Sequence, residues 1–277
     1  MNKIKTVMTE IFLNLNLIWT VARYNNKAQF QGHYLGIAWE ILDPLIQIII
    51  NFFIFGGIRP RNDVNVGLGL SYIVVGFFPW MLVGTVAWMF MNKVTLTGAT
   101  SVSSKMKMVA KLQFPISVLP AMTLASRTVA YLAMTVVMIV VLLFNGFGPS
   151  LYWLQAIYYM FAMYVFMYFF ALLNSTLTIL SKDYIQILRP VMRFMMFFSG
   201  VIWRLNEIRN LPNWFVQLMD LNPFSYIITG FRFTFFGQAF FWEHWETTVF
   251  FWLLMLVLAL GSTHLHLKLR AKFVDLV

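Results

Sequence analysis

The sequence has no cysteine and few charged residues. Without a thiol anywhere in its 277 residues, disulfides, thiolate metal sites, iron–sulfur clusters and cysteine nucleophiles are excluded. Only 11% of the residues are charged and 60% are apolar, whereas a soluble domain carries about 25% charged residues. So few charges cannot cover the water-facing surface of a chain this long. An ordinary soluble enzyme, a disordered chain and a nucleic-acid-binding module are therefore excluded.

Groups for chemistry are scarce as well. The chain has 10 acidic residues and 4 histidines, and the pair His264 and His266 falls on different faces of a predicted helix. No set of acids, bases or metal ligands converges, so we expect neither a catalytic nor a metal site. A phosphate-binding loop of the G-x-x-x-x-G-K-[ST] type is also missing. We therefore expect no cofactor in this chain, and ATP and Mg²⁺ would bind to a partner.

Long charge-free runs predict membrane-spanning helices, which need about 20 mostly apolar residues. The 54 residues from Thr128 to Ser181 carry no charge and are interrupted by a turn signal at 145–149, which predicts two spans. The sequence predicts an all-α membrane protein with six spans, at about 35–58, 68–91, 114–144, 152–180, 188–203 and 246–266. Residues 204–245 mix apolar clusters with prolines and charges, which predicts short helices in or re-entering the membrane.

The distribution of basic residues predicts the orientation. With six spans both termini lie on one side, which holds fourteen Lys and Arg against five on the other. The positive-inside rule then places both termini in the cytoplasm. Residues 1–33 form an N-terminal segment, and residues 34–277 form the transmembrane domain. Apolar residues at helical spacing in the first segment predict an amphipathic helix at the membrane interface, and packing against the chain's own spans is the alternative.

Glu40, Asp43 and Arg127 are the charges in the predicted spans that we single out, because burial of a charge in a membrane is costly. Glu40 and Asp43 lie three residues apart, hence on one helical face. They either serve function or cap helices and pair with Arg23, Lys27 or a partner. Arg127 lies near the middle of the third span. It either meets an anionic headgroup on a transport path or forms an internal ion pair with Glu40 or Asp43.

Two polar segments, 93–113 and 181–189, are long enough for helices along the membrane surface, and ordinary loops are the alternative. A minority of the aromatic residues are candidates for lining a path for sugars, because ring faces stack on C–H surfaces. The candidates are Tyr72, Phe78, Trp80 and Tyr168.

Several short motifs occur in a characteristic order. They are Arg23-Tyr24, Leu35-Gly36 continuing through Trp39 to Pro44, Lys111 before Phe114-Pro115, Lys182-Asp183, and Asn222-Pro223 followed by Arg232. This series resembles the permeases of polysaccharide- and polyol-phosphate-exporting ABC-2 transporters over nearly the whole chain. Within that family the resemblance is greatest to the teichoic acid translocation permeases of Gram-positive bacteria.

The resemblance implies a permease in the bacterial cytoplasmic membrane, in contact with membrane lipid, acting as a homodimer with two copies of a separate ABC ATPase subunit. Its cargo would be wall teichoic acid linked to undecaprenyl diphosphate. An O-antigen, capsule or other lipid-linked polysaccharide is the alternative cargo, and a membrane-embedded cell-wall transferase is a less favoured function. An ion-coupled carrier is disfavoured because no internal repeat is visible.

The resemblance also implies roles for individual residues. Segments 93–113 and 181–189 would be coupling helices received by the ATPase, and 204–245 would form helices that roof the outer end of the path. The residues that couple to the ATPase would be Lys105, Lys107, Lys111, Lys182, Asp183 and Tyr184, and those at the entrance for the diphosphate would be Arg23, Lys27, Glu40 and Asp43. The transport path would be lined by Tyr72, Phe78, Trp80, Arg127 and Tyr168. The outer gate would consist of Asn222, Pro223 and Arg232.

Overall fold

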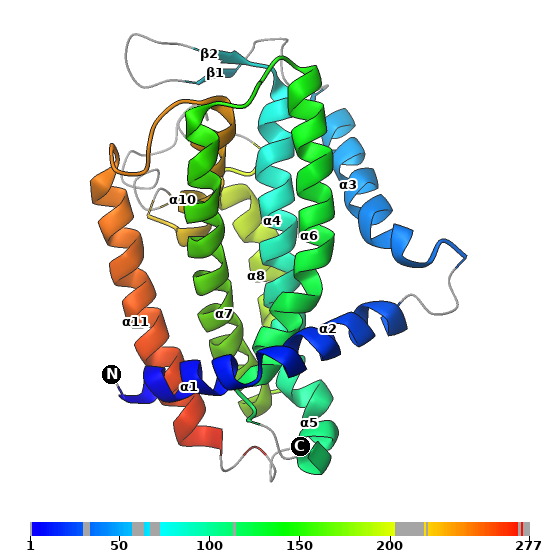
Figure 1. Cartoon of the computed structure of the whole chain (residues 1–277), viewed down its shortest axis with the longest axis vertical. Helices are drawn as coiled ribbons and strands as arrows, with labels where there is room; N and C mark the ends of the chain where they lie inside the picture. The colour runs from blue at the N-terminus through cyan, green and yellow to red at the C-terminus, as the bar shows by residue number, and fades with distance from the viewer. Residues whose placement is uncertain are drawn as a thin grey trace.

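The computed structural model is a bundle of long helices with two further helices lying across it (Figure 1). It describes residues 2–29, 34–56, 64–66, 73–112, 115–202, 219, 221–270 and 273. The first helix and the end of the last helix lie at the same end of the bundle, which we call the terminal end. The opposite end carries a pair of short strands and is called the hairpin end.

The N-terminal segment forms two helices, α1 (Asn2–Leu13) and α2 (Leu15–Gln29). They are separated at Asn14, whose Nδ2 donates to the carbonyl oxygen of Glu10 at 2.7 Å. Both helices pack against the bundle, α1 on α11 and α2 on α6, and bury Val7, Ile18 and Ala22. The apolar faces of α1 and α2 thus pack against the chain's own helices, which was the alternative interpretation of the amphipathic pattern. A position of the same helices at the membrane interface stays a prediction.

A proline interrupts the backbone hydrogen bonding of the helix that follows. After the short 3-10 helix η1 (Gly36–Ala38), α3 (Trp39–Gly56) contains Pro44 in its second turn. Proline cannot donate to the carbonyl four residues earlier, which here belongs to Glu40. The helix packs on α4 and α6, and its other side exposes Ile46, Ile49 and Phe53.

Two strands correct the all-α expectation. β1 (Val64–Val66) and β2 (Ile73–Val75) pair antiparallel, with Val64 opposite Val75. β2 occupies part of the predicted span 68–91, so the helix there, α4 (Phe77–Ala99), begins later and continues past Lys93. The charge-free run therefore predicted neither end of this helix correctly. The start is later because β2 occupies residues 73–75, and Pro79 is tolerated in the first turn of the helix. The end is later because Lys93 has an ion-pair partner.

Helix α4 is the core of the bundle. It packs against α3, α6, α7, α8 and α10 and is buried along most of its length, including Trp80 and Trp88, each 3% exposed. Small residues allow close approach: a Cβ added at Gly98 would lie 2.7 Å from that of Ala171 on α7. Helix α5 (Ser101–Leu112) follows, so the predicted surface helix within 93–113 begins only at Ser101.

Three predicted spans coincide with helices long and apolar enough to cross a membrane: α6 (Val118–Phe144), Leu151–Leu180, which joins η2 (Leu151–Gln155) to α7 (Ala156–Leu180), and α11 (Trp245–Leu269). The predicted turn between the first two is confirmed, since α6 ends before Gly146, whose φ is 84°. Within the described residues the other three spans stay predictions, and the six-span count is not established.

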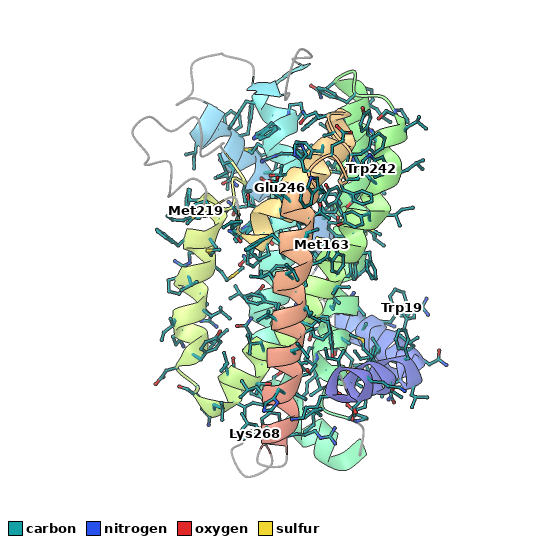
Figure 2. The ribbon with its side chains drawn as sticks, turned by 90° about the vertical axis from the view of Figure 1, so that its left-hand side faces the viewer. Trp19, Met163, Met219, Trp242, Glu246 and Lys268 are labelled. Carbon is teal, nitrogen blue, oxygen red and sulfur yellow. The ribbon has the colours of Figure 1, made fainter. Side chains whose placement is uncertain are left out.

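The remaining helices differ from expectation in their limits. α8 (Tyr184–Phe198) begins inside the predicted coupling segment 181–189, so that segment is a turn and the start of α8. It is a continuous helix despite Pro190. α10 (Pro223–Phe236) is largely buried within the predicted roof, 204–245, of which residues 204–218 and 220 lie outside the described part. Figure 2 shows Trp242 near the hairpin end and Lys268 at the terminal end of α11.

The contact between Gly98 and Ala171 predicts opposite effects of one substitution at two glycines. In Gly98→Ala the added methyl group overpacks α4 against α7, and we expect a loss of about 1–3 kcal/mol. Gly261→Ala is the matched control, because nothing lies within 4 Å of a Cβ there and alanine favours a helix by about 1 kcal/mol. Thermal unfolding in detergent measures both. Equal melting temperatures for the two variants would contradict the close packing.

Candidate functional site

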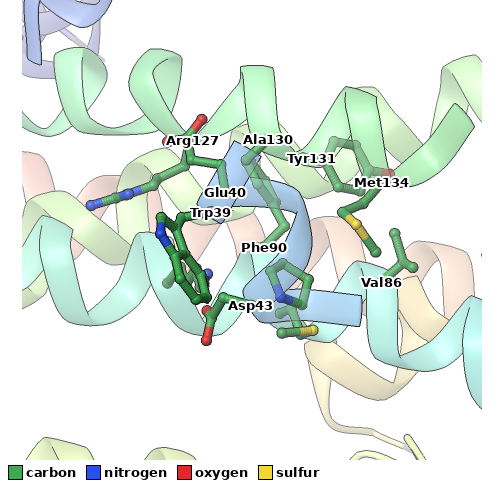
Figure 3. Close-up of a pocket in the computed structure, with 12 residues that line it drawn as sticks. Trp39, Glu40, Asp43, Val86, Phe90, Arg127, Ala130, Tyr131 and Met134 are labelled. Atoms are coloured by element: carbon green, nitrogen blue, oxygen red, sulfur yellow. Dashed lines mark hydrogen bonds and ion pairs between the residues drawn. The ribbon is translucent and has the colours of Figure 1, made fainter. Parts of the chain in front are cut away.

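A cavity of about 300 Å³ lies between the start of α3 and the middle parts of α4 and α6. Figure 3 shows Arg127 and Glu40 toward one end of it and Met134 and Val86 toward the other. Apolar and aromatic side chains form most of its wall, and four charged residues face it. The charged residues are Glu40, Asp43, Lys93 and Arg127.

Helical spacing explains why these residues meet. On α4 the lining residues are Val86, Met89, Phe90 and Lys93, and on α6 they follow the same pattern from Arg127 to Met134. Positions separated by three, four and seven residues share one face of a helix. Glu40 and Asp43 share the facing side of the first turn of α3. The cavity is therefore a meeting of three single helix faces.

Opposite charges from different helices are paired across this cavity. The Lys93 ammonium lies 2.9 Å from Oδ2 of Asp43, and Glu40 is attracted to Arg127 by electrostatic interaction. Glu40 is only 5% exposed, so its charge needs this compensation. Arg127 and Glu40 thus attract each other, while Asp43 pairs with Lys93; an ion pair between Arg127 and Glu40 stays a prediction.

Arg127 also faces a second cavity, of about 200 Å³, which lies one turn further along the same face of α6. Lys105 of α5 and Asn25 of α2 face it too, together with hydroxyl groups of α4, α5 and α6. Ser126, next to Arg127, exchanges hydrogen bonds with Asn26: the Asn26 Nδ2 donates to the Ser126 carbonyl at 2.9 Å, and the Ser126 hydroxyl donates to Asn26 Oδ1. This pair holds α2 against α6 beside the arginine.

A second buried arginine has a different environment. Arg232 of α10 is 2% exposed and donates to the carbonyl oxygens of Gly200 and Val201, each at 2.7 Å. Its guanidinium lies 3.7 Å from the centre of the Trp80 ring. These contacts tie α10 to the end of α8 and to α4, and a Cβ at Gly84 would meet the guanidinium.

The outer-gate residues lie together. Asn222 caps α10: its side-chain oxygen accepts from the backbone N–H of Phe224 at 3.0 Å, and its Nδ2 donates to the Ser199 hydroxyl at 2.9 Å. Pro223 follows at the first helical position, where its missing N–H has no cost. Trp80, predicted to line a path, lies under Arg232 instead of on an open surface.

The other predicted residues are more scattered. Tyr168 is buried, and its hydroxyl donates to the Ser117 carbonyl at 3.2 Å. Phe78 contacts Phe52 edge to face near the hairpin end. Arg23 and Lys27 are exposed on α2, and Lys182 and Asp183 are exposed before α8, where the Tyr184 hydroxyl donates to Asn174 Oδ1 at 2.5 Å. Tyr72 and the side chains of Lys107 and Lys111 lie outside the described part.

Among the four charged residues that line this cavity, Lys93 is the one that sequence analysis did not select as a site residue. It was counted among the basic residues that follow the second span, because a charge there is ordinarily a solvated one. Its spacing from Val86 and Phe90 was available as a signal, since it puts Lys93 on one face with them. Recognising it also required knowing that α4 continues to Ala99.

Comparisons with known proteins match most of the chain. The family model for the ABC-2 type transporter matches residues 16–236. A protein of Klebsiella pneumoniae named as an O-antigen export system permease is 22% identical over 263 residues, covering 95% of each chain. A protein of the same name from Myxococcus xanthus is 21% identical over 241 residues, covering 86% of this chain and 85% of its own length.

The pair Asp43–Lys93 predicts a reciprocal charge effect. Asp43→Lys alone or Lys93→Asp alone places like charges together, and we expect each to lower stability by about 1 kcal/mol. The double exchange restores opposite charges and should recover most of the loss. Lys182→Asp, in the exposed turn before α8, is the control and should leave stability unchanged. Melting temperatures that simply add in the double variant would show that the pair does not interact.

Proposed function

The chain belongs to the ABC-2 type transporter family, and on this basis we propose that it is the permease subunit of an exporter of lipid-linked polysaccharide. A member of this family is a transport component that works with an ABC ATPase. The observation that supports export of a charged lipid is the group of four charges that three helices bring into one cavity. A helix bundle that only anchored a partner would gain nothing from burying Glu40 and Arg127.

The nature of the cargo is revised by the comparisons. Sequence analysis favoured wall teichoic acid, with O-antigen and other lipid-linked polysaccharides as the alternative. The similar proteins carry the name of O-antigen export permeases, and no similarity singles out teichoic acid. We therefore place an O-antigen type of polysaccharide, linked to a polyprenyl diphosphate such as undecaprenyl diphosphate, ahead of teichoic acid as the cargo.

The proposed arrangement is a homodimer with two copies of the ATPase. The excess of Lys and Arg supports a cytoplasmic position for the terminal end, and α1 and α2 would then lie at the inner surface of the membrane. A diphosphate headgroup would then arrive beside α2, where Arg23 and Lys27 are exposed, and close to the cavity with Glu40, Asp43 and Arg127.

Coupling to ATP hydrolysis would act at the same end. α5 and the start of α8 project there, and they carry the predicted coupling residues. ATP binding by the partner would push these elements and switch the bundle between two arrangements. Arg232 and Asn222, which join α10 to α8 and α4, would transmit that movement to the outer gate.

A genetic test distinguishes the cargoes. In a Gram-negative strain that lacks its own O-antigen export permease, this chain expressed with its ATPase should restore O-antigen at the cell surface. In a Gram-positive strain depleted of its teichoic acid export permease, the same pair should restore less wall teichoic acid. Surface polymer is measured by immunoblot and phosphate content.

The ATPase expressed alone is the control for both strains, and it should restore nothing. Restoration of teichoic acid without restoration of O-antigen would reverse the order of the two cargoes. Failure to restore either polymer, with the complex formed and inserted, would contradict polysaccharide export.

The lysines at positions 107 and 111, four residues apart in the sequence, predict loss of coupling on charge reversal. We expect Lys107→Glu together with Lys111→Glu to lower substrate-stimulated ATP hydrolysis and export several-fold without loss of folding. Lys5→Glu together with Lys268→Glu is the matched control, because both of these lysines are exposed away from α5. Unchanged export in the α5 variant would remove these two lysines from the coupling mechanism.

A further inference from the structure

The second cavity combines two cations with polar walls and has no carboxylate among the described residues that line it. Lys105 and Arg127 face it from α5 and α6, and Asn25 faces it from α2. The remaining wall consists of Thr97, Thr100, Ser101, Ser104, Thr123 and Ser126. Every lining residue is therefore a cation, an amide or a hydroxyl.

The hydroxyl groups are already engaged, which leaves the cations as the principal donors. Thr97 donates to the carbonyl oxygen of Lys93 at 2.6 Å, and Ser104 donates to that of Thr100 at 2.7 Å. Such bonds to the preceding turn satisfy the hydroxyl hydrogens within the helix. An anion in the cavity would be held chiefly by the Lys105 ammonium and the Arg127 guanidinium.

The two cations lie close enough to disfavour each other. Burial lowers the pKa of Lys105 from its usual value, and the positive charge of Arg127 lowers it further. Across the described ranges, no Asp or Glu lies at ion-pair distance from Lys105. Glu40 attracts Arg127 from the first cavity, but it is not among the described residues that line this second one. The cavity thus carries an excess of positive charge.

We propose that the cavity between α2, α5 and α6 is a binding site for a phosphate or diphosphate group, held by Lys105 and Arg127. Arginine binds phosphate through two parallel hydrogen bonds and lysine acts as a point charge. The identification of a lipid diphosphate as the source rests on the proposed function, whereas a phosphate site as such does not.

The site gives Lys105 a different role from the one that the sequence suggested. Lys105 was grouped with Lys107 and Lys111 as a residue that contacts the ATPase. In the structure it faces inward to the cavity beside Arg127. Arg127 is then shared: it is attracted to Glu40 in the first cavity and faces the anion in the second. Anion binding would compete with Glu40 for the same guanidinium.

Equilibrium binding to the purified full-length chain in detergent tests the site. Inorganic pyrophosphate is one probe and a synthetic polyprenyl diphosphate is the other, and thermal stabilisation reports binding. We expect Lys105→Met to weaken binding about tenfold or more, as for loss of a hydrogen bond to a charged group. Lys268→Met, which removes an exposed cation at the same end, is the matched control and should bind as the wild type does.

Glu40→Gln gives a second readout that a purely structural role of Lys105 would not produce. Removing the carboxylate that attracts Arg127 should tighten the binding of both probes. This variant also keeps the test decisive if a substitution of Arg127 prevents folding. Elution as a single species in size-exclusion chromatography confirms that each variant is folded.

The outcomes separate the sources of the phosphate. Weaker binding of both probes in Lys105→Met supports a phosphate site, and binding of the polyprenyl diphosphate alone identifies a lipid headgroup as its ligand. Binding of pyrophosphate alone supports a site for soluble phosphate. Unchanged binding in a folded Lys105→Met variant would overturn the phosphate site, and the export function would still be decided by the genetic test. Failure of export in that test, with phosphate binding intact, would overturn the export function alone.

Discussion

The attraction between Glu40 and Arg127 is the constraint on which the arrangement at the terminal end depends. A buried carboxylate and a guanidinium in an apolar bundle each need compensation, and each supplies it to the other from a different helix. This attraction holds the start of α3 against α6, and Asp43 with Lys93 holds it against α4. Because Arg127 borders both cavities, which follow one another along the same face of α6, anything that changes its partner also changes how firmly α3 is held.

The opposite part of the bundle holds its buried arginine by different contacts. Arg232 is held by the backbone carbonyls of Gly200 and Val201, in the turn that follows α8, and by the face of Trp80. These contacts are rigid, since they engage main chain and a buried ring. The bundle therefore has one arginine, Arg127, whose partner can change, and a second, Arg232, whose contacts are fixed. Such a combination suits a permease in which movement starts at the terminal end.

Much of the fold follows from the sequence, and the exceptions have physical causes. The charge-free run and the turn at Asn145 predicted α6 and α7 because nothing interrupts either helix. The limits of α4 were wrong because a paired Lys93 does not end a helix. Trp80 was predicted to line a path and is buried, since an aromatic residue near a predicted interface also packs under a cation. The site was found only in part: Glu40, Asp43 and Arg127 were selected one by one, but their meeting with Lys93 and Lys105 depends on which helix faces adjoin.

The central claim is that this chain, with an ABC ATPase, moves a polyprenyl-diphosphate-linked polysaccharide across a membrane. The most direct measurement reconstitutes both proteins in liposomes and follows a short labelled lipid-linked polysaccharide with an impermeant enzyme that cleaves only the exposed saccharide. The account predicts transfer to the opposite leaflet that requires ATP, the ATPase and this chain together. Transfer that proceeds without the ATPase would contradict the account. The account would also be contradicted if no transfer occurs while the assembled complex hydrolyses ATP in the presence of the lipid-linked polysaccharide.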